Sequence, residues 1–175
     1  FKSKEAGPKI IDTIWMTRAA KWNGIIQSWK KDPSIIILCW FDGTLQELQS
    51  IFSKETTADV SLLIASHVHT SQLAGKKVIA AEHYPLRKKE QELYQKLDLP
   101  EVIIHSALDE PLFDRFGGSK IVQMMKQLGM KEQDSVQHKM ITQSIVNAQE
   151  KIEKKLGTEH LANSQEEWMA KNLVD

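Results

Sequence analysis

Short apolar runs alternate with amphipathic segments along the first 106 residues. Helical spacing of apolar side chains predicts helices from about 17 to 30, from 44 onward and from 85 to 97. Runs rich in β-branched and aromatic residues predict strands at 10–16, 35–41, 59–67, 76–83 and 101–106. Strands of this length that alternate with helices are typical of a mostly parallel sheet covered on both faces. The pattern predicts an α/β domain at 10–106.

The pattern changes after Ser106, where helical spacing continues without a further predicted strand. Asp109 and Ser119 are predicted to cap two short helices, and a longer helix is predicted from about Val136 to Leu156. These elements form an all-helical extension at 107–156 that packs on the α/β domain. The residues at 157–175 form a polar tail, which is either loosely attached or a docking segment.

Composition narrows the class of protein. With 175 residues the chain is long enough for one domain with a substantial core. Lys and Arg number 23, as do Asp and Glu, so no net field attracts nucleic acid or an anionic membrane. The single Cys39 lies in an apolar run, which predicts an inert buried thiol and a reducing compartment. No run is long enough to span a membrane, and we expect a cytoplasmic protein.

The stretch FDGTL at 41–45 follows a predicted buried strand, as in the active site of haloacid-dehalogenase-type phosphatases. That chemistry needs a nucleophilic aspartate two residues before the acid–base aspartate. Asp42 holds the second position, but Trp40 holds the first and has no oxygen that could attack phosphorus or bind magnesium. The structural alternative is that Thr44, with Glu47 three residues later, forms a capping box that starts a helix. We favour the structural interpretation.

The segment from Ala107 to Lys155 carries a more specific pattern, ALDEPLFDRFGGSKIVQMMKQLGMKEQDSVQHKMITQSIVNAQEKIEKK. It resembles the part of SecA, the preprotein-translocase motor ATPase family, in which the second nucleotide-binding domain ends and the helical scaffold begins. A weaker resemblance extends back to Ile10. It implies a RecA-like, helicase-like α/β domain that runs into a scaffold helix. The positions that match in order and spacing are Leu108, Asp109, Leu112, Arg115, Phe116, Gly117, Met124, Met125, Leu128, Gly129, Met130, His138, Ile145, Asn147, Ala148 and Gln149.

The chain departs from the SecA pattern where that family binds ATP. ASHVHTSQL replaces the glycine-rich loop, and Tyr94 and Gln95 replace the first arginine of a pair and the glycine after it. No GxxxxGK[ST] phosphate loop is present. Without guanidinium groups the charge of a phosphoryl-transfer transition state is not stabilised. We therefore expect a degenerate relative of the second motor domain, with no catalytic residues, no cofactor and no ATPase activity of its own.

Two classes of function remain open. The first is a non-catalytic accessory or regulatory module in protein transport, which binds the translocation motor or a related protein. The second is a small phosphotransferase or nucleotide-binding protein that uses the crevice at the carboxyl ends of the strands. The residual nucleotide-binding candidates are Asp42, Thr44, Arg87 and Lys88. The missing nucleophile and phosphate loop favour the first class.

Three histidines are candidate ligands for a metal ion. His67 and His69 would face the same side of a strand, with His83 on a neighbouring strand. A zinc site would need a further ligand, and Cys39 lies inside an apolar strand. Histidines in polar turns at strand ends are the commoner arrangement, so we expect no metal.

Overall fold

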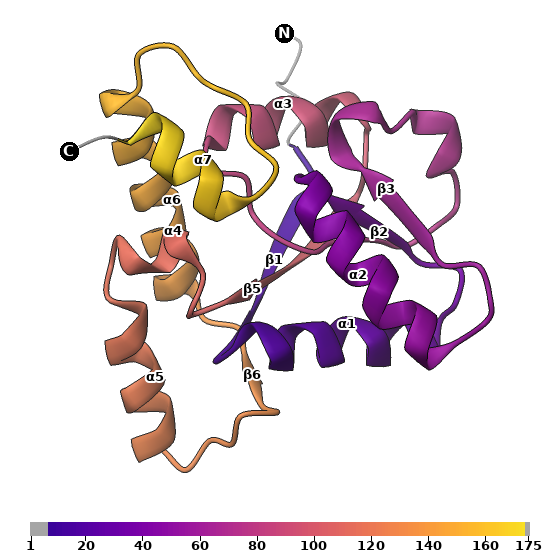
Figure 1. Ribbon diagram of the computed structural model, residues 1–175, viewed down its shortest axis with the longest axis horizontal. Helices are drawn as coiled ribbons and strands as arrows, with labels where there is room; N and C mark the ends of the chain where they lie inside the picture. Colours follow the sequence, from indigo (N-terminus) through magenta and orange to yellow (C-terminus); the bar gives the residue numbers. More distant parts are fainter. Residues whose placement is uncertain (1–6, 174–175) are drawn as a thin grey trace, which may run out of the picture.

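The computed structural model describes residues 7–173 and is built on a six-stranded sheet with strand order β3-β2-β4-β5-β1-β6 (Figure 1). The first five strands are parallel to one another, and β6 is antiparallel to β1. The strands are β1 (Lys9–Trp15), β2 (Ile36–Cys39), β3 (Ser61–Ile64), β4 (Val78–Ala80), β5 (Glu101–Ala107) and β6 (Ser135–Val136). This α/β architecture confirms the predicted fold class and is consistent with a RecA-like fold.

Seven helices in residues 7–173 surround the sheet. They are α1 (Arg18–Lys31), α2 (Asp42–Glu55), α3 (Arg87–Lys96), α4 (Pro111–Asp114), α5 (Gly118–Gln127), α6 (Lys139–Lys155) and α7 (Gln165–Asn172). Two short 3₁₀ turns, Ala65–His67 and Thr70–Gln72, follow β3. Thr17 caps α1 as predicted, because its side-chain oxygen accepts a hydrogen bond from the backbone N–H of Ala20 at 3.1 Å.

The two faces of the sheet have separate apolar layers because successive strand residues point to opposite sides. Ile37 of β2 packs with Trp22 of α1 and Phe52 of α2 on one face. Leu38, the next residue, packs on the other face with Tyr94 of α3. The predicted strand–helix alternation therefore buries its apolar positions as expected.

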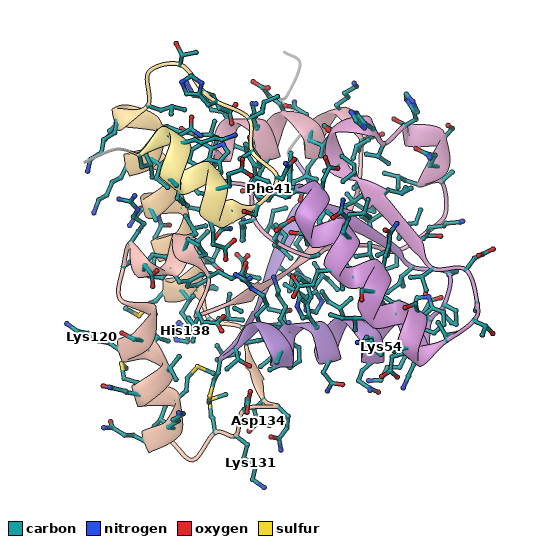
Figure 2. All side chains as sticks on the ribbon, in the orientation of Figure 1. Phe41, Lys54, Lys120, Lys131, Asp134 and His138 are labelled. Carbon is teal, nitrogen blue, oxygen red and sulfur yellow. The ribbon has the colours of Figure 1, made fainter. Side chains whose placement is uncertain are left out.

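A third apolar cluster joins the C-terminal helices to the sheet. Ile14 of β1 packs there with Phe113 of α4, Met125 of α5 and Ile145 of α6. Trp168 of α7 belongs to the same cluster and is fully buried. In Figure 2 the side chain of Phe41, another member, lies inside the molecule where α2 meets α7.

Several predictions of local structure are wrong. Strands do not stop at Ser106, because Val136 pairs with Ile14 in the short strand β6. The long helix consequently begins at Lys139, after the cap residue His138. Ser119 does not cap α5, which follows Gly117 in the left-handed conformation at φ 82°.

Asp109 does not cap α4 either. The residue before that helix is Glu110, and Asp109 instead accepts a hydrogen bond from the backbone N–H of Arg18 at 3.2 Å. The predicted strand at 59–67 is shorter than expected, since β3 ends at Ile64 and the chain turns through His67. The sequence located α4 and β3 approximately, but it did not show which group Asp109 bonds.

The segment after Gly157 is not loosely attached in its described part. Trp168 is fully buried, and its indole N–H donates to Glu159 at 2.8 Å. Its ring packs edge-on against Tyr84, with ring centroids 6.1 Å apart. Of the two alternatives for this segment, docking onto the chain's own domain is the one observed.

Candidate functional site

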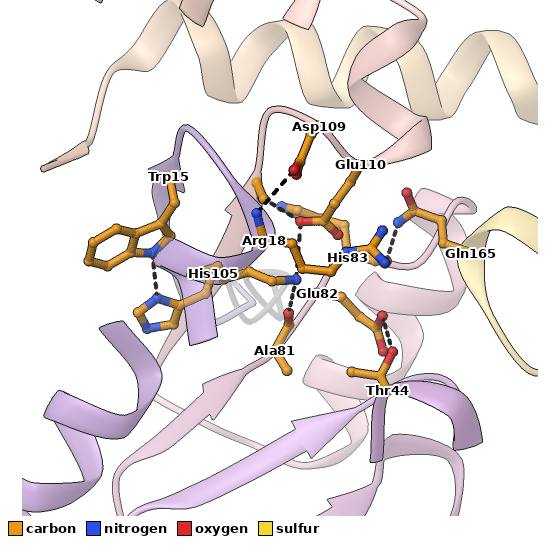
Figure 3. A network of polar contacts seen from close by, with 12 residues as sticks. Trp15, Arg18, Thr44, Ala81, Glu82, His83, His105, Asp109, Glu110 and Gln165 are labelled. Atoms are coloured by element: carbon orange, nitrogen blue, oxygen red, sulfur yellow. Dashed lines mark hydrogen bonds and ion pairs between the residues drawn. The ribbon is translucent and has the colours of Figure 1, made fainter. Parts of the chain in front are cut away.

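The carboxyl ends of the parallel strands form the edge at which open α/β sheets commonly bind ligands. Glu82 lies there, two residues after β4, and is only 3% exposed. Its Oε2 accepts the backbone N–H groups of Trp40 at 3.0 Å and Phe41 at 3.2 Å, and its Oε1 accepts the Thr44 hydroxyl at 2.6 Å (Figure 3). The Glu82 carboxyl group therefore holds the turn that precedes α2, next to the helix N–H groups that could otherwise bind a phosphate.

The C-terminal segment closes the same edge from outside. The backbone N–H of Gly43 donates to the carbonyl oxygen of Asn163 at 2.8 Å, so the segment before α7 reaches the beginning of α2 (Figure 1). A Cβ at Gly43 would lie 2.6 Å from that oxygen, which explains why the position suits glycine. The chain itself thus supplies the acceptor for the Gly43 N–H in the first turn of α2.

A buried ammonium group lies behind this edge. Lys21 of α1 is 1% exposed, and its Nζ donates to the carbonyl oxygen of Ala81 at 2.7 Å and to Glu110 Oε1 at 3.1 Å (Figure 3). The same Nζ lies 4.3 Å from the centre of the Trp22 ring. Burial raises the pKa of Glu82 to about 7, although the nearby Lys21 charge acts in the opposite direction. These contacts make Lys21 a bridge between α1, β4 and the turn before α4.

His83 lies between two buried carboxylates. Its Nε2 is 2.6 Å from Asp12 Oδ1, and its Nδ1 is 2.9 Å from Glu90 Oε2. Burial lowers the pKa of His83, but the Glu90 and Asp12 charges outweigh burial and hold that pKa well above its usual value. The resulting imidazolium ties β1 to α3.

A cavity of about 640 Å³ opens beside this triad, between α3 and α6. Several of its polar groups are bonded to one another. Gln149 of α6 donates to the carbonyl oxygen of Tyr84 at 2.7 Å and also to Glu90, and Glu90 accepts the Tyr84 backbone N–H at 3.2 Å. The network holds α6 against the sheet and presents few free polar groups to a ligand.

The four predicted nucleotide-binding residues separate into two pairs. Asp42 is exposed at the start of α2, where Thr44 donates to Glu82. Arg87 pairs with Glu150 of α6 at 2.8 Å, and the backbone N–H of Lys88 donates to Glu153 at 2.8 Å. No hydrogen bond or ion pair within 7–173 joins the two pairs.

The predicted capping box of α2 is wrong. Thr44 accepts no backbone hydrogen bond there, because its hydroxyl donates to Glu82 instead. Glu47 accepts the Trp22 indole N–H at 3.1 Å and so ties α2 to α1. Residue Phe41 precedes the helix and has no capping side chain. The turn is held by a distant strand end rather than by its own sequence.

The histidines considered for a metal are dispersed. His67 lies in an exposed 3₁₀ turn and His69 follows it, whereas His83 is held by its two carboxylates. Cys39 is fully buried, and burial raises the pKa of its thiol. In the described part of the chain no three His, Cys, Asp or Glu side chains are arranged to hold a metal ion.

Sequence reasoning missed the buried polar residues that organise this edge. Lys21 could have been noticed because it interrupts an apolar helix face between Ala20 and Trp22. Glu82 and His83 directly follow an apolar run, which places them at the carboxyl end of a strand. Glu90 lies in the highly charged stretch RKKEQELYQK, and only the fold shows that it is buried.

Comparison with known proteins shows sequence similarity over only part of the chain. No known protein-family profile matches the chain. It is 30% identical over 86 residues to the "Protein translocase subunit SecA" of Acinetobacter baumannii ATCC 17978, a match to 47% of this chain and 10% of that protein. SecA of Psychrobacter sp. PRwf-1 is 29% identical over 86 residues, and that of Psychrobacter arcticus is 25% identical over 108 residues, or 59% of this chain.

The chain therefore spans only 10% of the length of the first curated relative that it matches. These matches show a SecA-related region over about half of the chain. Within residues 7–173, no helix has the length and apolar character needed to cross a membrane.

Proposed function

We propose that this chain is a non-catalytic accessory or regulatory module in protein transport, which acts in the cytoplasm by binding the SecA motor or a related protein. The local similarity to the translocase subunit supports the transport role, because a RecA-like architecture alone hosts many functions. In this proposal 10–106 form a degenerate motor-type domain, 107–156 its helical extension, and 157–175 the polar tail, of which the described part contributes Trp168 to the core.

The observation that carries the non-catalytic role is the filled strand-end edge. Glu82 bonds the backbone of Trp40 and Phe41, and the carbonyl oxygen of Asn163 bonds Gly43. A nucleotide phosphate at this turn would have to displace the Asn163 oxygen, and it would approach Glu82, which repels a phosphate when it is ionised. This repulsion disfavours the alternative of a phosphotransferase or nucleotide-binding protein near Asp42.

A contact surface for the motor is available on the C-terminal helices. Met124 of α5 is 61% exposed, Leu128 directly after α5 is 78% exposed, and Met140 of α6 is 73% exposed. Methionine side chains adapt their shape to a partner, and exposed apolar groups gain free energy when a partner covers them. Lys120 and Lys131 extend from the same end of the molecule (Figure 2).

Biolayer interferometry with immobilised chain and purified full-length SecA from the same organism tests the proposal. We expect saturable binding that the double variant Met124→Glu, Leu128→Glu weakens at least about tenfold. Leu161→Glu is the matched control, because Leu161 is 74% exposed on a different segment. Absence of saturable binding, with ATP present or absent, would overturn the proposal.

A further inference from the structure

A second pocket, unrelated to the strand-end edge, lies between α1 and the sheet. Its volume is about 330 Å³. Side chains of β1, β4 and β5 form its floor, α1 forms one wall, and the segment that carries β6 forms another. The polar residues that line it include Asn23, Gln27, Lys31, Lys77, His105 and Gln133.

The charged side chains that line the pocket are all basic. The lining contains two lysines, and no Asp or Glu is among the described residues around the pocket. Lys31 and Lys77 are exposed, and neither forms an ion pair within residues 7–173. Asp32, next to Lys31 in the sequence, is engaged by the backbone N–H of Ser34 at 3.1 Å and by the Ser34 hydroxyl at 2.5 Å. Two ammonium groups therefore line the pocket without an ion pair in residues 7–173, although the Ser34 hydrogen bonds and the Lys77 charge, which reaches Asp32, lower the pKa of that carboxyl.

His105 supplies a buried donor at the floor. It is 4% exposed, and its Nδ1 accepts the Trp15 indole N–H at 3.0 Å (Figure 3). Burial and the charges of Lys21 and Lys77 lower the pKa of His105 to about 3, so the ring is neutral at physiological pH. Because Nδ1 accepts, the ring proton lies on Nε2. In the described part of the chain Nε2 has no hydrogen-bond partner, and Figure 3 shows it pointing away from the polar network.

We propose that this pocket binds a small anion that carries a carboxylate or phosphate group. Such an oxyanion would accept a hydrogen bond from His105 Nε2–H, while Lys31 and Lys77 would neutralise its charge at the rim. The amides of Asn23 and Gln27 would supply further hydrogen bonds. Within residues 7–173, His105 Nε2 is not one of the fully buried polar atoms that lack a partner, so this donor is open to the pocket. An oxyanion that replaces water there would accept its hydrogen bond and lie close to both lysines.

Nuclear magnetic resonance of the intact chain tests the site directly. Inorganic phosphate and malonate are titrated separately at constant ionic strength, and the Trp15 indole and His105 ring signals are followed. We expect one of the two anions to give saturable shifts, and the one that saturates identifies the anion class. Shifts that stay linear with concentration for both anions would overturn the proposal.

Lysine variants distinguish a built site from general surface charge. Lys31→Ala and Lys77→Ala are each expected to weaken the anion affinity about fivefold. The controls are Lys30→Ala and Lys76→Ala, which remove neighbouring exposed charges that do not line the pocket. Equal weakening by the controls would show non-specific screening and would contradict the proposal.

Discussion

The backbone N–H of Gly43 donates a hydrogen bond to the carbonyl oxygen of Asn163 across 2.8 Å, which joins the beginning of α2 to the segment before α7. This bond crosses the edge at which a parallel sheet commonly takes its ligand. On the inner side of the same turn, Glu82 bonds the backbone of Trp40 and Phe41. The strand-end edge therefore provides contacts that join α2 to the C-terminal segment and to the end of β4.

Gly43→Ala is expected to destabilise the protein. Its Cβ would lie 2.6 Å from the Asn163 oxygen, so α2 and the C-terminal segment would have to separate. We expect a loss of about 1–3 kcal/mol in the free energy of unfolding, measured by chemical denaturation. Hydrogen exchange of α7 should accelerate in the same variant.

The matched control is Gly157→Ala, because no atom lies within 4 Å of a Cβ at that position. That variant should unfold within about 0.5 kcal/mol of the wild type. If both glycine variants behaved alike, the contact between Gly43 and Asn163 would not be part of the folded structure in solution.

Trp168→Ala should be among the most destabilising single changes. The side chain is fully buried, and its removal leaves a cavity beside Tyr84. Large-to-small core substitutions of this kind cost about 3–5 kcal/mol, and thermal melting should shift accordingly. Leu161→Ala, at a side chain that is 74% exposed, should leave the melting temperature nearly unchanged. A Trp168 variant as stable as the Leu161 variant would show that α7 is dispensable.

The sequence predicted the elements that contain long apolar runs. It did not predict the elements that depend on contacts between residues far apart in the sequence. Strand β2 and helix α1 follow directly from their patterns. Strand β6 has only two residues, which is too few to show an alternation of apolar and polar positions. It forms because Val136 pairs with Ile14 of β1. The position of Trp168 was hidden because it is one aromatic residue within a polar stretch.

The same reason explains what was missed at the strand-end edge. Thr44 and Glu47 have the spacing of a capping box, and the sequence gives no sign that Glu82 competes for the Thr44 hydroxyl. The Thr44 hydroxyl therefore donates to Glu82, which follows β4, and does not cap its own helix. Candidate residues near a turn could therefore be found from sequence, but their bonding could not.

Stability should fall as the pH rises above about 6.5. The pKa of His83 in the folded state lies well above the ordinary value, so its charged contacts stabilise the protein fully below that value and are lost as the pH rises through the folded-state pKa. Glu82, with its pKa raised to about 7 by burial, contributes a fall in the same direction between about pH 4.5 and 7.

Urea denaturation of the wild type and of His83→Gln at a series of pH values measures this dependence. The variant should be less stable at pH 6 and should lose the decline above about pH 7, because Glu82 contributes only up to that pH. His67→Gln is the control, because His67 is exposed in a turn. An unchanged decline in the His83 variant would assign the pH dependence to other groups.

The buried pair of Lys21 and Glu110 gives a test by rescue. Lys21→Met leaves the Glu110 carboxylate buried without its counter-charge, and breaking such a pair costs about 3–5 kcal/mol. Adding Glu110→Gln should recover much of that loss, because the amide oxygen still accepts the Ala107 backbone N–H. Denaturation of both variants provides the measurement. A double variant no more stable than Lys21→Met would contradict the pairing.

Isothermal titration of the purified chain with ATP and magnesium tests the central claim most directly, because the claim is that the chain's own groups fill the strand-end edge. We predict no saturable heat and no ATP hydrolysis. Saturable binding that Asp42→Ala or Arg87→Ala abolishes would contradict the account. Loss of binding in Asp42→Ala would place the nucleotide at the beginning of α2, where it would compete with the Asn163 carbonyl oxygen, and loss in Arg87→Ala would place it beside α6.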